Sequence, residues 1–76
     1  MTIKEANTPV DYRISGILKE KGLKQLFVAE KIGYTAQELN DMLNGRRLIK
    51  ICDIPQIADA LEVDANYLFG IEKGDG

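Results

Sequence analysis

Residues 25–44 read QLFVAEKIGYTAQELNDMLN and decide the fold. Apolar positions recur with helical spacing on both sides of Gly33, which predicts one short helix over about Gln25–Ile32 and a second that begins after Thr35. Gly33 can adopt the left-handed turn conformation without steric cost, and Thr35 and Glu38 have the spacing of a capping box. The second helix is expected to end at Asn44-Gly45. The residues expected to face inward are Val28, Ala29, Ile32, Leu39 and Met42.

One more helix is predicted before this pair. Val10, Ile14, Ile17 and Leu18 follow the spacing i, i+4, i+7, i+8, which is one helical face. Just ahead of them, Thr8 can cap the helix together with Asp11, and Pro9 suits the first helical position. Gly22 is expected to end this helix.

Two helices are predicted after the pair. Apolar residues at 54, 57, 58 and 61 mark the first, with Asp53 as its cap and Pro55 in its first turn. The second is a short turn from Ala65 to Phe69, capped by Asp64 and closed by Gly70. No stretch alternates in hydropathy like a strand. The sequence therefore predicts a compact all-α domain of five helices over residues 8–71, with flexible segments at 1–7 and 72–76.

Composition limits the possible chemistry. The 76 residues suffice for one small domain. With one cysteine and no histidine, the usual zinc and haem ligand sets and any histidine-based catalytic triad are excluded. We expect no metal, no cofactor and no enzymatic activity. No apolar run approaches the ~20 residues of a membrane span, and the unpaired thiol fits a reducing cytoplasm.

Charge is distributed unevenly along the chain. The formal net charge is −2, yet residues 1–50 contain nine Lys or Arg and six acids, whereas residues 51–76 contain one Lys and six acids. A small domain with opposed ends can present a basic face despite an acidic total. A solvated surface of mixed charge is the alternative interpretation.

Two helices joined by a short turn with a glycine form a helix-turn-helix. The run KQLFVAEKIGYT (24–35), then Leu39, NGRR (44–47) and IADALEV (57–63) resembles the lambda-repressor-like helix-turn-helix proteins, the Cro/repressor or XRE-type regulators. The resemblance extends over about residues 14–70. It implies that the third helix, about residues 36–44, enters the major groove of double-stranded DNA.

The resemblance and the residue chemistry together assign roles at this surface. The candidates for base readout are Ala36, Gln37, Asn40 and Asp41. The candidates for phosphate contacts are Gln25, Thr35, Asn44, Arg46, Arg47 and Lys50. A Gln or Asn amide can bond adenine, an ionised Asp can accept from cytosine, and Arg and Lys supply positioning charge. Glu38 has two interpretations, a capping-box partner or a base contact.

The sequence departs from the family pattern at three points. Leu43 stands where the family usually has Glu, and Glu62 replaces the usual Gly, so that a non-glycine residue is expected at positive φ. The predicted recognition helix contains Glu38 and Asp41 but no Lys or Arg.

These departures leave two functions open. The first is a small phage-type or Cro-like repressor that binds a pseudo-palindromic operator as a homodimer. The second is a protein-interaction module, an antitoxin or antirepressor, with weak or no DNA binding. The apolar residues Tyr67, Leu68, Phe69 and Ile71 could either cover the core or form a dimer surface.

Overall fold

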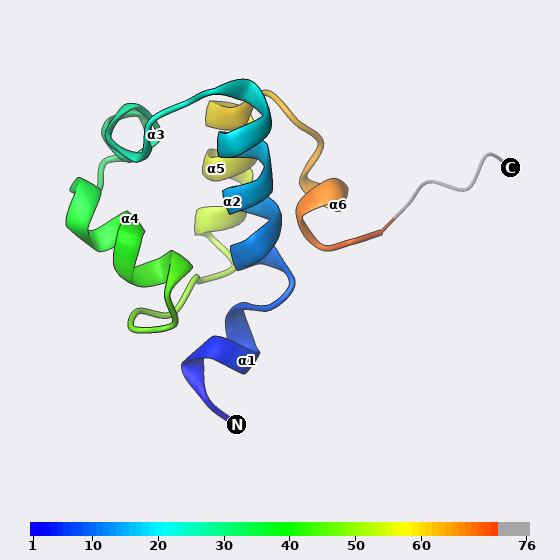
Figure 1. Cartoon of the computed structure of the whole chain (residues 1–76). Helices are drawn as coiled ribbons and strands as arrows, with labels where there is room; N and C mark the ends of the chain where they lie inside the picture. Colours follow the sequence, from blue (N-terminus) through cyan, green and yellow to red (C-terminus); the bar gives the residue numbers. More distant parts are fainter. Residues whose placement is uncertain (72–76) are drawn as a thin grey trace, which may run out of the picture.

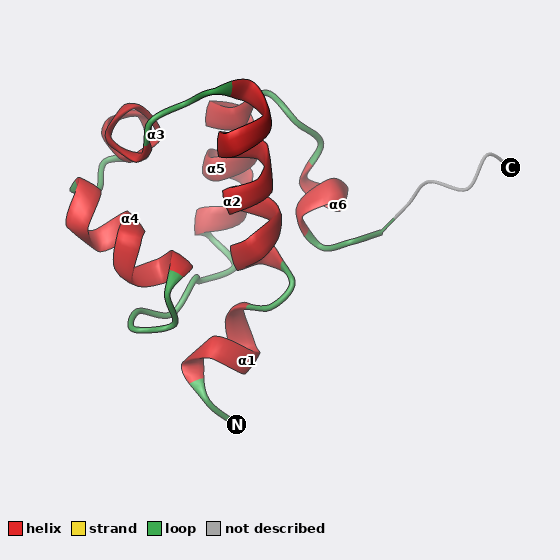
Figure 2. Cartoon of the chain, viewed as in Figure 1, coloured by secondary structure: helices red, strands yellow, loops and turns green. Residues whose placement is uncertain are grey.

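The computed structural model describes residues 1–71, and this part of the chain contains only helices and the turns that join them. The helices are α1 (Ile3–Asn7), α2 (Val10–Lys21), α3 (Gln25–Ile32), α4 (Ala36–Leu43), α5 (Asp53–Leu61) and α6 (Ala65–Leu68) (Figures 1 and 2). None of the helices in this range is long and apolar enough to cross a membrane.

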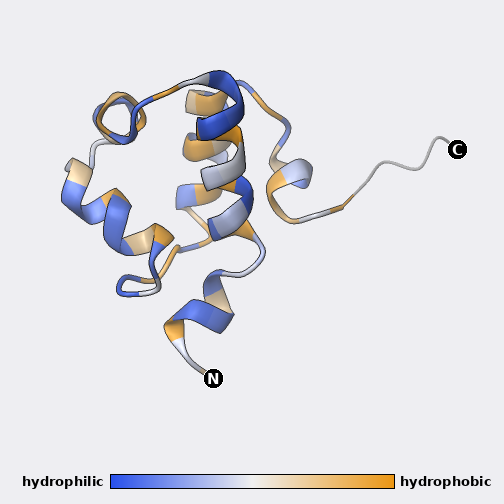
Figure 3. Ribbon diagram, viewed as in Figure 1, coloured by the Kyte–Doolittle hydropathy of each residue, from blue (hydrophilic) through white to orange (hydrophobic). Residues whose placement is uncertain are grey.

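The core lies where these helices meet. α3 packs against both α4 and α5, α2 packs against α4 and α6, and α5 packs against α6. Figure 3 shows hydrophilic and hydrophobic residues on each helix, as is typical of amphipathic helices that pack around one core. All the residues that the sequence predicted for the shared core are buried: Val28, Ala29, Ile32, Leu39, Met42, Ile14, Leu18, Ile57 and Leu61.

The predicted helix ends are confirmed around the central pair. α3 begins at Gln25 and ends before Gly33, whose φ of 80° lies in the left-handed region. Thr35 and Glu38 form the expected capping box at the start of α4. The prediction of a strained residue after α5 is also confirmed, because Glu62 has φ 59°.

The predicted number of five helices was wrong, because residues 1–7 contain a helix and are not a flexible segment. Thr2 and Glu5 form a capping box that starts α1, and Asn7 at its last position is almost completely buried. The structure thus has a sixth helix where the sequence prediction placed a flexible segment. Residues 72–76, predicted as a flexible tail, lie outside the described residues.

Two predicted caps were also wrong. Thr8 ends α1 and donates its hydroxyl to Lys4 O, and α2 begins after Pro9 without a side-chain cap. Asp53 lies one residue inside α5, whose N-cap is Cys52. The Asp53 carboxylate instead accepts hydrogen bonds from the Lys50 amide and the Tyr34 hydroxyl. These bonds fasten the chain before α5 to the turn between α3 and α4.

The C-terminal apolar residues differ in burial. Leu68 is fully buried and covers the core. Tyr67, Phe69 and Ile71 are about half exposed, and Arg13 stacks on the Tyr67 ring.

Candidate nucleic-acid interface

α4 has one buried side and one exposed side. Leu39, Met42 and Leu43 are buried in the core. Gln37 is exposed, and Ala36, Asn40 and Asp41 are partly exposed. All four predicted base-reading residues are therefore accessible to solvent, on a helix whose opposite side packs in the core.

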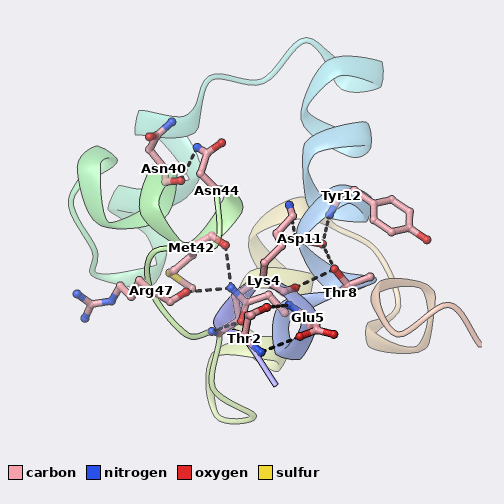
Figure 4. Close-up of polar contacts among 12 residues, drawn as sticks. Thr2, Lys4, Glu5, Thr8, Asp11, Tyr12, Asn40, Met42, Asn44 and Arg47 are labelled. Carbon is pink, nitrogen blue, oxygen red and sulfur yellow. Dashed lines mark hydrogen bonds and ion pairs between the residues drawn. The ribbon is translucent and has the colours of Figure 1, made fainter.

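Side-chain amides link this exposed side to its neighbours. The Asn40 amide donates to Gln25 Oε1 at the start of α3 (3.4 Å), which joins a predicted phosphate contact to a predicted base contact. The Gln37 amide donates to Asp41 Oδ1 (2.9 Å). The Asn44 amide donates to the Asn40 carbonyl (2.8 Å), as Figure 4 shows. These bonds form two groups on the exposed side of α4, one of Gln25, Asn40 and Asn44 and one of Gln37 and Asp41.

The two arginines of the loop after α4 lie against the two acids of α4. Arg46 Nη1 is 3.4 Å from Asp41 Oδ1, and Arg47 Nη1 is 3.3 Å from Glu38 Oε2. The Arg47 guanidinium also stacks on the ring of Tyr34, 5.2 Å from its centroid. Both ion pairs are on the surface, where such pairs contribute about 0–1 kcal/mol. The arginines can therefore exchange these partners for others at little cost.

Glu38 is the capping-box partner of Thr35, so this interpretation of the residue is confirmed. The Thr35 amide donates to Glu38 Oε1 (2.8 Å), and the Glu38 amide donates to Thr35 Oγ1 (3.0 Å). The hydrogen bond from the Thr35 backbone, more than the nearby Arg47 charge, holds the pKa of Glu38 below its ordinary value. The acid at this position thus stabilises the start of α4.

The turn ahead of α4 is fixed by Tyr34. Its hydroxyl donates to Asp53 Oδ1 at 2.6 Å. This hydrogen bond to a carboxylate, with smaller effects of burial and of the Asp53 charge, raises the pKa of Tyr34. A neutral phenol therefore holds the turn under the Arg47 guanidinium. The sequence pattern did not indicate this bond, because nineteen positions separate the two residues.

The other predicted phosphate contacts lie around α4. Thr35, Asn44, Arg46 and Lys50 are exposed, and Gln25 and Arg47 are partly exposed. Lys50 lies nearer the start of α5, where its backbone amide donates to Asp53 Oδ2.

Sequence reasoning missed Asn7, which holds the backbone of the arginine loop. The buried Asn7 side chain makes three hydrogen bonds to backbone groups between Met42 and Ile49. The signal that could have indicated its helix was the capping-box spacing of Thr2 and Glu5.

Comparisons with known proteins bear on the family and the fold of this chain. A family model described as "Helix-turn-helix" matches residues 14–68. The solved structure of the restriction-modification controller protein C.AhdI from Aeromonas hydrophila is similar in fold, with a TM-score of 0.77 and 23% sequence identity over 87% of this chain and 96% of that one. No curated protein sequence matches the chain.

Proposed function

The chain belongs to the XRE-type helix-turn-helix family, and from this premise we propose that it is a sequence-specific transcriptional regulator that reads the major groove of double-stranded DNA with α4. The observation that supports the proposal best is the set of hydrogen-bonding side chains on the exposed side of α4, with the start of α3 and the arginine loop beside them. Hydrogen-bonding side chains on an exposed helix, flanked by arginines, suit base contacts in the groove and phosphate contacts beside it.

Each side chain has a role that follows from its chemistry. Gln37 and Asn40 would read bases through their amides, and Gln37 can bond one adenine at two positions. Ala36 would contact a thymine methyl group, and Asp41 would accept from cytosine N4. The phosphate contacts would come from Gln25, Thr35, Asn44, Arg46, Arg47 and Lys50.

We further propose that the regulator is a homodimer on a pseudo-palindromic operator, as a phage-type or Cro-like repressor would be. Two copies related by a two-fold axis would place their α4 helices in successive major grooves, about 34 Å apart. The half-exposed Tyr67, Phe69 and Ile71 are available for such a contact. Such a regulator needs no catalytic site and acts where the DNA is, in the cytoplasm. Sedimentation of the free chain at micromolar concentration tests the dimer, and a monomer there would contradict it.

Arg46 and Arg47 are expected to bind phosphates. Replacing both by Ala should weaken binding to every duplex alike and lower the log–log salt slope by about 1–2, because each phosphate contact contributes about 0.9. Fluorescence anisotropy with labelled random duplex, from low to moderate salt, measures both quantities. A change of sequence preference, with the salt slope unaltered, would show instead that these arginines read bases.

Gln37 is expected to read sequence. Gln37→Ala should lower affinity for an operator selected from random DNA by roughly 1–3 kcal/mol, the value of one bidentate base contact. Binding to scrambled DNA should stay nearly unchanged. Glu20→Gln, an exposed change on α2, is the control. Equal losses on both DNAs would assign Gln37 a structural role only.

The second candidate function, a protein-interaction module, is favoured by one observation. Both loop arginines are paired with acids of α4, so these acids offset the positive charge of the two arginines. If the wild-type chain bound random and selected duplexes equally weakly, and without steep salt dependence, this second function would replace the first.

A further inference from the structure

We propose that Asn7 is a positioning residue for DNA binding: from α1 it fixes the loop between α4 and α5, and so holds Arg46 and Arg47 where phosphates can be reached. The inference rests on the proposed function and assigns a role to a segment outside the matched helix-turn-helix, since that match begins at residue 14.

The hydrogen bonds of Asn7 reach both ends of the loop. Its Nδ2 group donates to Met42 O, in the last turn of α4, and to Arg47 O, each at 2.9 Å. Its Oδ1 accepts from the Ile49 amide at 2.8 Å. One side chain, only 1% exposed, therefore ties together backbone groups that lie before, within and after the arginine pair. Figure 4 shows Met42 and Arg47, the residues whose carbonyls accept these two bonds.

The backbone bonds that hold the arginine pair to α4 share a single acceptor. The Arg46 and Arg47 amides both donate to the Asp41 carbonyl, at 2.8 and 3.2 Å. Their side chains lie at the surface, against acids of α4 and, for Arg47, against the Tyr34 ring. Asn7 supplies the buried contacts on the other side, and buried bonds hold a geometry that solvent-exposed pairs do not.

α1 is itself fastened to the domain. Lys4 Nζ lies 2.7 Å from the carboxylate of Asp11, a fully buried residue of α2. The same lysine lies against the loop, since a Cβ placed on Gly45 would be 3.0 Å from Lys4 Cβ and 3.3 Å from its Cα. Gly45 has φ 79° and so meets two demands at once, the turn and the close approach of α1. The loop is thus clamped between α4 and an anchored α1.

A loop ordered before binding loses less conformational freedom when it meets DNA. The role of Asn7 should therefore be visible only through the arginines that it positions. This dependence on the arginines distinguishes a positioning role of Asn7 from a general role in stability. A loss of stability alone would weaken DNA binding whether or not the arginines are present.

A double-mutant cycle tests the inference. Asn7→Ala is measured in the wild-type chain and in the Arg46→Ala/Arg47→Ala chain, by anisotropy with labelled random duplex at low temperature. Circular dichroism establishes that each variant is folded. In the wild-type background we expect Asn7→Ala to weaken binding about tenfold and to lower the salt slope by about 1. In the arginine-free background we expect less than about a twofold loss.

Two further variants keep the test decisive. Asn7→Ser puts a hydroxyl in place of the amide and so keeps one polar group at this buried position, and it replaces Asn7→Ala in the cycle if that variant does not fold. Ile57→Val removes a methyl group from the core at a fully buried position of α5, and its effect on binding should be equal in both backgrounds.

The outcomes separate this inference from the proposed function. A wild-type chain without salt-dependent binding would overturn the proposed function. A wild-type chain that binds, with equal losses from the Asn7 change in both backgrounds or with none in either, would overturn the positioning role alone.

Discussion

Glu38 combines two tasks in one carboxylate. One oxygen accepts the Thr35 amide and completes the capping box, while the other lies near Arg47. The first contact is the main reason for its lowered pKa, with the guanidinium second among the effects that lower it. An acid that would repel a phosphate therefore has a structural role at this position, and a neighbouring arginine offsets its charge.

The lowered pKa of Glu38 predicts a pH dependence of stability. Because the carboxyl binds its proton less tightly in the folded chain, its contribution is present above the ordinary pKa of 4.5 and is lost as the pH falls through the lower, folded-state pKa. Glu38→Gln keeps a capping-box side chain but cannot titrate. We expect the variant to melt below the wild type at neutral pH, with the difference in Tm vanishing once the pH has fallen below the folded-state pKa of Glu38.

Thermal melting followed by circular dichroism from about pH 7 to about pH 3 measures this difference. Glu20→Gln, at an exposed position of α2 without a capping role, is the control. A Glu38→Gln difference that stayed constant over the whole range would contradict the prediction.

At the scale of elements, local signals were sufficient for α3 and α4. Gly33, the Thr35 capping box and the apolar spacing each depend on residues within one or two helical turns, and they predicted the helix ends closely. The same signals gave the exposed side of α4, since a buried Leu39 fixes which residues point outward. The fold and the position of the candidate surface could thus be predicted from the sequence.

The contacts that shape that surface could not be predicted in this way. Asn7 bonds groups 35 to 42 positions away, and the sequence alone gives no reason to pair them. α1 was missed because a helix of five residues is too short to show an apolar period and is stabilised by tertiary contacts. Asp53 was assigned to a cap that its neighbour occupies, because its carboxylate has distant partners as well as local ones.

Leu39 fixes α4 to the rest of the domain and is fully buried. Leu39→Ala is expected to cost about 2–5 kcal/mol in free energy of unfolding, from the lost burial and the cavity left behind. Urea denaturation followed by circular dichroism measures the loss. Leu26→Ala on α3, where the side chain is 53% exposed, should cost far less. Similar losses for the two variants would show that α4 does not rest on this core.

At the scale of the whole molecule, the net charge of −2 does not describe the candidate surface. The acids after residue 50 are Asp53, Asp59, Glu62, Asp64, Glu72 and Asp75. Among them, Glu62 follows the C-terminal end of α5, which lies at the opposite end of the view in Figure 1 from the loop of Arg46 and Arg47. Because charges separated by more than about 8 Å are largely screened at physiological salt, the local charges on α4 should matter more for DNA binding than the total.

This argument predicts that position decides the effect of removing two negative charges. Glu38→Gln/Asp41→Asn removes the acids that face the arginines, so each arginine loses its competing partner and a phosphate loses a repelling neighbour. With each repulsion of order 1 kcal/mol or less, affinity for random duplex should rise about tenfold.

Asp59→Asn/Glu62→Asn changes the net charge equally at the end of α5, and Asn tolerates the positive φ at position 62. Anisotropy at about 0.15 M salt should show less than a threefold gain for this second pair. Equal gains for both pairs would mean that the chain meets DNA through its total charge, and the oriented docking of α4 would then lose its electrostatic support.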